Sequence, residues 1–323
     1  MRAIPHIQLA HLPTPIESLP KLTSKLNGPK LFVKRDDLTG LAFGGNKTRK
    51  LEYLLAEAQA HGARTVITAG AVQSNHCRQT AAACARLNFE CILVLSGDKP
   101  LQATGNLMLD QLFNARLVWT SRQERNSTLQ QTFNDAWEAG RRPYLVPYGG
   151  SNSTGACAYA FAMKELGDQG FKPDWIVFAS SSGGTQAGLV CGARLVNFKG
   201  KVLGISVDET EADLQAKVAP LANDTSDLLC EKTDFAPQEI LVSAEYLGGG
   251  YGVMGAAEEE AIRMFAREEG LLLDPVYTAR AAAGMIDLIH KGYFKREEKV
   301  LFWHTGGTPA LFSENFAGLA NPV

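Results

Sequence analysis

The sequence predicts an α/β fold in which a mostly parallel sheet carries helices on its faces. One observation is that short β-branched or aromatic runs alternate with longer segments of helical period along the 323 residues. A second is that three of these runs lead directly into small polar residues and then a helix, at 69–76, 179–185 and 304–308. Ligands bind at this carboxyl edge of the strands in open α/β sheets. We therefore expect the functional site at these three junctions.

The predicted elements follow from local pattern. Strands are expected where apolar runs of four or five residues, or three at 144–146, are bounded by turn or polar residues: 31–34, 65–68, 91–95, 116–119, 144–146, 175–178, 202–206 and 300–303. Helices are expected at 47–60, 184–196 and 254–268. In the first helix Leu51, Leu54, Leu55 and Ala58 share one face, and Gly62 follows where a helix-ending glycine belongs.

Composition excludes several classes of function. The chain has 45% hydrophobic and 20% charged residues, a net charge of -2 and no run rich in Lys and Arg. Nothing therefore suggests binding to nucleic acid or to an anionic membrane, and a small metabolite is the expected partner. Prolines interrupt the N-terminal segment, and no apolar stretch approaches the length of a membrane helix. We expect a soluble, cytoplasmic protein.

The cysteines predict core packing rather than a metal site. None of the six forms a C-x-x-C pair, which argues against zinc or redox chemistry. Cys77 and Cys84 are seven residues apart, on one face of a predicted helix, and Cys91 opens a predicted strand.

Lys47 is the candidate catalyst, because it stands just behind Gly44 and Gly45 where a loop enters a predicted helix. The alternative is a surface lysine after an ordinary turn. Residues 40–48 also nearly spell a phosphate-binding P-loop, but Asn46 separates the glycine from the lysine. The strand at 31–34 is moreover followed by polar residues instead of leading into that loop, so we do not favour a P-loop.

Ser182, Gly183, Gly184 and Thr185 lie between a predicted strand and a predicted helix. Such a turn can point several backbone N–H groups at one anion and so form a phosphate cup. The alternative is a glycine turn without a ligand. The segment does not match G-x-G-x-x-G, so a dinucleotide site is not supported.

Gln73, Ser74, Asn75 and His76 begin another predicted helix and offer enough donors for a carboxylate. The alternative is that Ser74 or Asn75 only caps the helix. A catalytic triad around His76 is not expected, because the chain has no G-x-S-x-G motif.

Two tyrosines are candidates for moving a proton. Tyr251 stands among glycines at 248–252, and Tyr277 follows the turn signal of Asp274 and Pro275. A phenol can transfer a proton when its surroundings tune its pKa. Taken alone, a tyrosine in either setting is more often explained by packing than by catalysis.

Taken together, these segments resemble a known family. The chain is similar to the family that contains D-cysteine desulfhydrase and 1-aminocyclopropane-1-carboxylate deaminase, among the tryptophan synthase β-type enzymes that use pyridoxal 5'-phosphate. The resemblance extends over nearly the whole chain and rests on Lys34-Arg35-Asp36-Asp37, Gly44-Gly45-Asn46-Lys47-Thr48-Arg49-Lys50, Gln73-Ser74-Asn75-His76, Ser182-Gly183-Gly184-Thr185, Asp274-Pro275-Val276-Tyr277 and His304-Thr305-Gly306-Gly307.

The resemblance implies a fold, a cofactor and an assembly. The fold is that of the type II pyridoxal phosphate enzymes, with two open, twisted, mostly parallel sheets flanked by helices. Residues 1–49 and 156–323 would form a large cofactor-binding domain, and residues 50–155 a small α/β domain. A homodimer is implied as well.

The resemblance also implies a role for each matching residue. Lys47 would hold the cofactor as a Schiff base and act as the base, while Asn75 would meet the ring hydroxyl and Thr305 the ring nitrogen. The phosphate site would comprise Lys50, Ser182, Gly183, Gly184 and Thr185. Contacts with the substrate are implied for Gln73, Ser74, His76, Tyr251, Tyr277 and Thr278.

The implied activity is a β-elimination. Thr278 resembles the desulfhydrase branch, whereas the cyclopropane-opening deaminases carry glutamate at that place. This favours the conversion of D-cysteine to pyruvate, hydrogen sulfide and ammonia. The alternatives on the same scaffold are 1-aminocyclopropane-1-carboxylate deamination, L-cysteate sulfo-lyase activity and elimination from D-serine or β-chloroalanine. A non-catalytic, anion-binding regulatory protein is the alternative from a different class.

Overall fold

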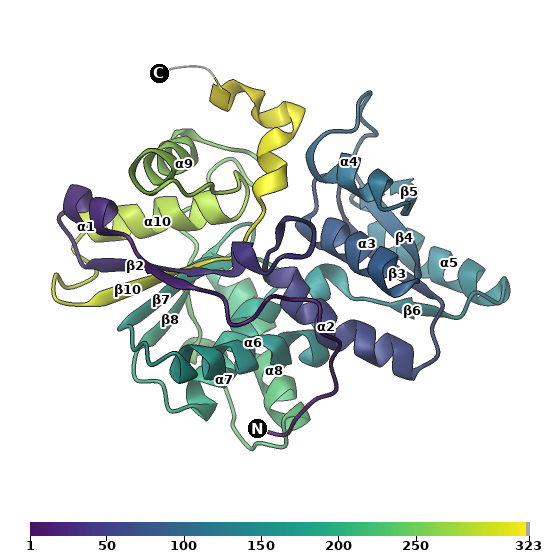
Figure 1. Ribbon diagram of the computed structural model, residues 1–323, viewed down its shortest axis with the longest axis horizontal. Coiled ribbons are helices and arrows are strands. Elements are labelled where there is room, and N and C mark those ends of the chain that lie inside the picture. The colour runs from purple at the N-terminus through teal and green to yellow at the C-terminus, as the bar shows by residue number, and fades with distance from the viewer. Residues whose placement is uncertain (321–323) are drawn as a thin grey trace.

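The chain folds into two open sheets, each covered on both faces by helices (Figure 1). The structure is a computed structural model and describes residues 1–320. None of the helices within these residues is long and apolar enough to cross a membrane.

The larger sheet has six strands, and every neighbouring pair except β1 and β2 is parallel. Their spatial order is β1 (Ile16–Ser18), β2 (Lys30–Arg35), β10 (Lys299–His304), β7 (Trp175–Ser180), β8 (Lys201–Ser206) and β9 (Leu241–Ser243).

Two groups of three helices cover this sheet, one on each face (Figure 1). The first group is α1 (Pro20–Leu26), α9 (Ala256–Glu269) and α10 (Thr278–His290), and the second is α6 (Ser153–Asp168), α7 (Gly184–Leu195) and α8 (Glu211–Leu228). Successive side chains of β10 enter opposite cores: Val300 and Phe302 pack on the α10 side, and Leu301 and Trp303 on the α6 side. Because both faces are buried, the strands appear in the sequence as continuous apolar runs.

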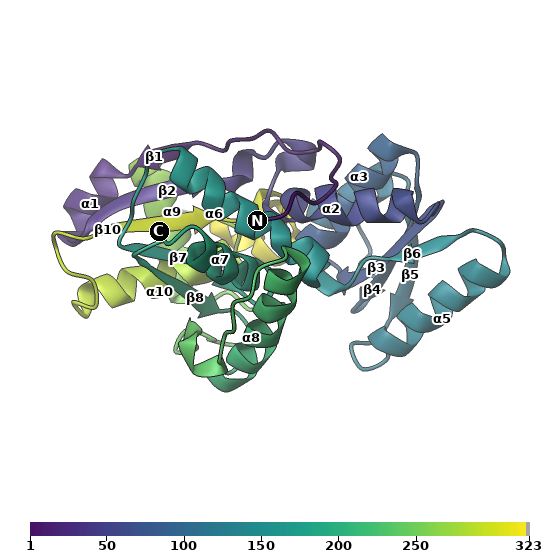
Figure 2. The same ribbon diagram turned by 90° about the horizontal axis from the view of Figure 1, so that it is seen from below.

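The smaller sheet is entirely parallel and has the order β5 (Arg116–Thr120), β4 (Glu90–Ser96), β3 (Thr65–Ala71) and β6 (Pro143–Leu145). One face is covered by α2 (Asn46–Ala60), α3 (Asn75–Leu87) and α4 (Gly105–Leu112). The other face is covered by α5 (Arg125–Glu138), which Figure 2 shows on the opposite side of the sheet from α2 and α3.

Every predicted strand and helix is confirmed, with ends displaced by at most a few residues. The edge strands β1 and β9 were not predicted, since each is short, ends in a polar residue and contains no continuous apolar run of three residues. Cys77, Cys84 and Cys91 lie together in the core between α3 and the smaller sheet, as their spacing predicted. The strands of the smaller sheet fall within residues 65–145, inside the predicted small domain, although its boundaries at 50 and 155 stay a prediction.

A buried carboxylate, Asp36, fixes the loop between β2 and α2. Arg49 donates to it through Nε at 3.0 Å and Nη2 at 2.8 Å. The Tyr159 hydroxyl donates at 2.6 Å and the Trp303 indole N–H at 2.8 Å. Burial alone would raise the pKa of Asp36, but the Arg49 charge and the hydrogen bonds from Arg49 and Tyr159 hold that pKa below its ordinary value. Asp36 therefore joins α2, α6 and β10 at one point.

We expect replacement of Asp36 by alanine to lower the free energy of unfolding by about 3–5 kcal/mol, because it leaves the Arg49 guanidinium buried with Glu165 as its remaining carboxylate. Urea denaturation followed by circular dichroism measures the loss. The control is Asp168→Ala, which breaks an exposed pair with Lys164 whose side chains are 55% and 65% accessible, and should cost under about 1 kcal/mol. Equal losses in the two variants would contradict the role given to Asp36.

Candidate active site

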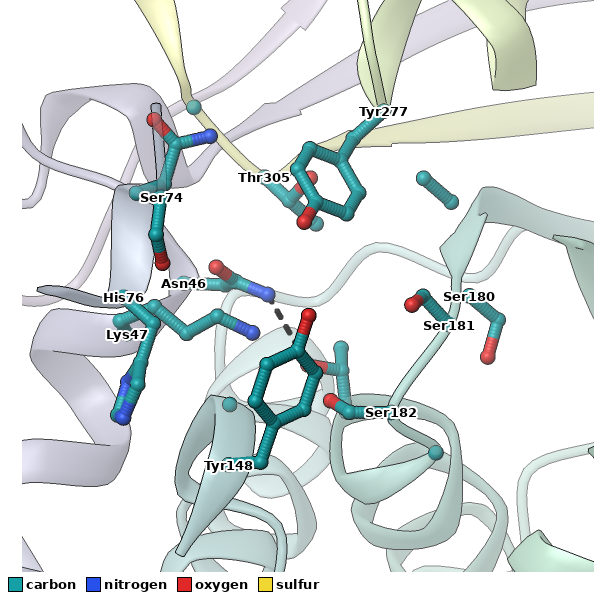
Figure 3. Close-up of a pocket in the computed structure, with 16 residues that line it drawn as sticks. Asn46, Lys47, Ser74, His76, Tyr148, Ser180, Ser181, Ser182, Tyr277 and Thr305 are labelled. Atoms are coloured by element: carbon teal, nitrogen blue, oxygen red, sulfur yellow. Dashed lines mark hydrogen bonds between the residues drawn. The ribbon is translucent and has the colours of Figure 1, made fainter. Parts of the chain in front are cut away.

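The carboxyl ends of strands from both sheets surround one pocket. Figure 3 shows Lys47 and Ser74 on one side of the pocket and Ser180, Ser181 and Ser182 on the other. The residues that line it are Asn46, Lys47, Ser74, Asn75, His76, Tyr148, Gly149, Ala179, Ser180, Ser181, Ser182, Gly183, Thr185, Tyr277, Thr305 and Gly306.

Lys47 enters the pocket from the first turn of α2 (Figure 3). The loop before it needs glycine, because Gly44 has φ +62° and a Cβ there would lie 2.1 Å from the Asp37 carbonyl oxygen. Burial lowers the pKa of Lys47 to about 8, against a hydrogen bond with Lys50 that raises it. The neutral, nucleophilic form of the amine is therefore present near neutral pH and predominates above about pH 8.

Lys50 lies one turn further along α2 and is 1% exposed. Its Nζ donates to the Gly149 carbonyl oxygen at 3.1 Å and to the Ser151 hydroxyl at 3.4 Å, so the amine stands behind the pocket wall. Burial and the charge of Lys47 lower its pKa well below the ordinary value. Within residues 1–320 no carboxylate lies within ion-pair distance of either amine. Within these residues neither lysine thus has a counter-ion, in keeping with the lowered pKa of both amines.

The turn from Ser182 to Thr185 lies at the N-terminus of α7 and forms the opposite wall. Gly183 has φ +81°, which favours glycine, and the Gly184 amide donates to the Ser151 hydroxyl at 3.3 Å. Thr185 accepts a hydrogen bond of 3.1 Å from the Asn46 side-chain amide, drawn as the dashed line in Figure 3. Helix N-termini of this kind attract anions. Gly184 itself does not line the pocket.

The α3 terminus contributes Ser74, Asn75 and His76 to the pocket. Ser74 caps α3 by accepting from the Cys77 amide at 3.2 Å, so the capping role considered from the sequence is confirmed while the residue also lines the pocket.

His76 is held as a neutral ring. Because Thr68 donates its hydroxyl proton to the Val146 carbonyl at 2.8 Å, the Nε2 of His76 must donate to Thr68, at 2.9 Å. Burial and the charges of Lys47 and Lys50 lower the pKa of His76 well below its ordinary value.

Tyr277 lines the pocket, and Tyr251 supports it from behind. The two phenol oxygens are 2.6 Å apart, so one hydroxyl donates to the other. Burial raises the pKa of both phenols, and both are protonated at neutral pH.

Thr305 lies on the remaining wall, just beyond β10. Its position is fixed because its carbonyl oxygen accepts a hydrogen bond of 3.0 Å from the backbone amide of Asn46.

Gln73 and Thr278 stand behind the pocket. The Gln73 side chain donates to the Thr104 carbonyl at 2.9 Å and accepts from the Asn106 amide at 2.8 Å. The Thr278 hydroxyl donates to the Asp274 carboxylate at 2.8 Å, which also accepts from the first amides of α10. Both side chains thus have structural partners, and their contact with a substrate stays a prediction.

Tyr148 lines the pocket but was not identified from the sequence. A signal was present, since the predicted strand at 144–146 runs into Pro147 and then Tyr148, Gly149 and Gly150. This is a fourth junction at which a strand leads into glycine, like the three junctions from which the sequence predicted the functional site. The Arg125 guanidinium lies 4.4 Å from the centre of the Tyr148 ring.

Comparison with known proteins gives the family. Residues 7–306 match the family described as "Pyridoxal-phosphate dependent enzyme". The chain belongs to this family. A crystal structure described as that of an "ACC deaminase homologue" is 36% identical, with a TM-score of 0.90 over 98% of this chain and 96% of that one. The enzyme is thus a pyridoxal phosphate-dependent member of the ACC deaminase family with the type II fold.

More distant structures share the fold. An L-serine ammonia-lyase from Rhizomucor miehei is 16% identical, with a TM-score of 0.69 over 98% of each chain. A hydrogen sulfide-producing enzyme from Fusobacterium nucleatum is 15% identical, with a TM-score of 0.66 over 94% of this chain and 97% of that one.

The pocket fits pyridoxal phosphate on its own chemistry. A phosphate needs an anion site, which the start of α7 and the uncompensated lysines offer. The buried Ser180 hydroxyl, which has no hydrogen-bond partner within residues 1–320, lies on the same wall. An amine of lowered pKa faces this wall, as carbonyl chemistry requires.

We expect Lys47 in the cofactor-free protein to react with an amine reagent half-maximally near pH 8. The midpoint is lower than for an ordinary lysine because burial disfavours the charged amine. Lys47 loses its proton about two pH units below an ordinary lysine of pKa ~10.4, and only the neutral form reacts. Competitive labelling with acetic anhydride, read by mass spectrometry, measures the titration, and Lys47→Ala identifies the peptide. A midpoint above pH 10 would contradict the low pKa.

Proposed function

We propose that the enzyme catalyses β-elimination of D-cysteine to pyruvate, hydrogen sulfide and ammonia. The observation that carries this proposal is that, within residues 1–320, an amine, an imidazole and two phenols line the pocket and no carboxylate does. Thr278, where a cyclopropane-opening deaminase would carry glutamate, has its hydroxyl bound to Asp274. The site therefore offers a neutral base and a protonated phenol.

The cofactor is assigned to the walls of this pocket. Its phosphate is placed at the cup of Ser182, Gly183, Gly184 and Thr185, with Lys50 behind as the compensating charge. The Lys47 amine is the covalent attachment. Asn75 and Thr305 are assigned to the ring hydroxyl and the ring nitrogen. When bound, pyridoxal phosphate withdraws electrons from the substrate Cα and so acidifies its hydrogen.

The substrate carboxylate is assigned to the N-terminus of α3, where Ser74 and the first amides of the helix can donate, with His76 behind as a neutral ring. Lys47, with its amine free, takes the proton from Cα. A pKa of about 8 suits this step, since the amine is largely unprotonated under mildly alkaline conditions and can still hold the proton it takes.

Tyr277 is assigned as the acid for the leaving sulfur. The Cβ–S bond breaks with its electron pair on sulfur, and the Tyr277 hydroxyl supplies the proton. Tyr251 holds the Tyr277 hydroxyl in place through the hydrogen bond between their oxygens, which are 2.6 Å apart. The released enamine takes up water and yields pyruvate and ammonia, which balances the reaction.

The competing substrates use the same site. They are 1-aminocyclopropane-1-carboxylate, L-cysteate, D-serine and β-chloroalanine, and the non-catalytic alternative would only bind an anion. An intact Lys47 with a low pKa favours catalysis over that last alternative.

We also propose a cytoplasmic homodimer. The proposal rests on the family resemblance, and large hydrophobic side chains such as Phe43 (61% exposed), Leu112 (70%) and Phe312 (68%) are available for contact with a partner. Light scattering on the purified enzyme measures the mass, and a mass of one chain would contradict the dimer.

The purified enzyme should release sulfide and pyruvate from D-cysteine and no 2-oxobutyrate from 1-aminocyclopropane-1-carboxylate. A lead-acetate or methylene-blue assay detects sulfide, and a hydrazone assay detects the oxo acids. Lys47→Ala should abolish both turnover and the absorbance of covalently held cofactor. Formation of 2-oxobutyrate without sulfide would overturn the proposed substrate.

Tyr277→Phe should reduce kcat on D-cysteine by about 10²-fold or more, because the thiolate loses its proton donor. The same variant should retain most of its kcat on D-β-chloroalanine, since chloride leaves without a proton. Tyr293→Phe, at an exposed tyrosine, is the matched control and should change neither rate. A loss of similar size on both substrates would contradict the role of Tyr277 as acid.

A further inference from the structure

Arg78 is a buried charge that the proposed reaction does not use. It lies on α3 one turn after Asn75, and its side chain is fully buried. Burial lowers its pKa to about 10, although the charges of Asp110 and Asp274 act to raise it. Within residues 1–320 no carboxylate is within ion-pair distance of its guanidinium. Burying a charge without an opposite partner costs free energy, and hydrogen bonds to the Arg78 guanidinium offset part of that cost.

Three acceptors surround the Arg78 guanidinium. Nη1 donates to Asn106 Oδ1 at 3.0 Å and to Asn75 Oδ1 at 3.3 Å, and Nη2 donates to the Gly44 carbonyl oxygen at 2.7 Å. Asn106 in turn donates its Nδ2 to the Gln73 carbonyl and to Asn75 Oδ1, each at 2.9 Å.

This network fixes the orientation of both amides. A guanidinium can only donate, and a backbone carbonyl can only accept. Asn106 must therefore turn its oxygen to Arg78 and its nitrogen to the Gln73 carbonyl. The Asn75 oxygen must face Arg78 as well, where it accepts from two donors. Rotating the Asn75 amide by half a turn would place N–H against N–H.

The nitrogen of Asn75 is thereby left for the pocket. Asn75 lines the pocket, and its Nδ2 makes no hydrogen bond within residues 1–320. That nitrogen lies over Gly307, close to where a Cβ at this glycine would stand, 2.8 Å away. The group that Asn75 meets in the pocket must accordingly be an acceptor.

Arg78 also joins two parts of the site. Gly44 belongs to the loop that leads into Lys47, whereas Asn75 and Asn106 belong to helices of the smaller sheet. One guanidinium therefore sets the spacing between the lysine loop and the α3 terminus.

We propose that Arg78, with Asn106, is a positioning residue that forces Asn75 to present an N–H group, so that the pocket selects the cofactor ring with its hydroxyl deprotonated. This inference rests on the placement of the cofactor ring at Asn75 and not on the identity of the substrate.

The test titrates the bound cofactor without substrate. Pyridoxal phosphate is bound to the wild type, Arg78→Met and Asn106→Ala, and its visible absorbance is followed between pH 5 and pH 10. Loss of a donor to the deprotonated oxygen should raise the apparent pKa of the bound cofactor, by about one unit in Arg78→Met and by less in Asn106→Ala. The Kd for pyridoxal phosphate, from equilibrium dialysis, should rise about tenfold in Arg78→Met.

Matched controls separate positioning from folding. Arg86→Met changes an exposed arginine on the same helix and should leave the titration and the Kd at wild-type values. Asn75→Ala should raise the apparent pKa of the bound cofactor as much as Arg78→Met does. The double variant Asn75→Ala/Arg78→Met should raise that pKa no further, because both changes remove the same interaction.

Two results would overturn the proposal. One is that Arg78→Met, shown to be folded by circular dichroism, titrates its bound cofactor with the wild-type pKa. The other is that the pKa shift of the double variant equals the sum of the shifts of the two single variants. If Arg78→Met does not fold, the Asn106→Ala titration decides, and an unshifted titration there counts against the proposal. Failure of wild-type protein to bind pyridoxal phosphate would instead refute the placement of the cofactor.

Discussion

The buried pair of Asp36 and Arg49 is the interaction on which the site depends. Arg49 is two residues after Lys47, so the contact that holds the guanidinium also fixes the first turn of α2. Asp36 is itself bound by Tyr159 of α6 and Trp303 of β10. A buried ion pair is weak as a source of net stability, because desolvation opposes the attraction. Its value here is geometric, since it gives one position to a helix shared between two sheets.

A second constraint is the sign of charge around the pocket. Lys50 and Arg78 are buried and Lys47 is partly buried, and within residues 1–320 no carboxylate lies within ion-pair distance of any of the three. Acidic groups near the site are directed elsewhere: Asp274 is occupied by the amides of α10, and Asp36 by Arg49. An anionic ligand completes this arrangement. Without it, the lowered pKa values of Lys47 and Lys50 mean that the amines relieve the repulsion by giving up a proton.

The sequence was sufficient to predict most strands, several helices and the junctions at 69–76, 179–185 and 304–308, because these depend on local pattern. Apolar runs identified the buried strands, a glycine pair before a helix located Lys47, and glycines after a strand located the cup at Gly183. It was insufficient where tertiary contact decides. The contact of Gln73 with a substrate stays a prediction, but the sequence could not show that its side chain is bound to Thr104 and Asn106, residues about thirty positions away. Arg78 gave no signal at all, because an arginine within a helix is ordinarily exposed and only the packed fold buries it.

The strand order of the larger sheet has a consequence for how the protein is made. β10 lies between β2 and β7, so residues 299–304 must insert between strands synthesised much earlier. The smaller sheet draws all its strands from 65–145 and can assemble once that segment has left the ribosome. β2 has only the short β1 as its neighbour until residues 299–304 emerge, and Thr305 arrives with β10. The pocket is therefore completed only after residues 299–306 have been synthesised, by long-range pairing of the kind that folds slowly.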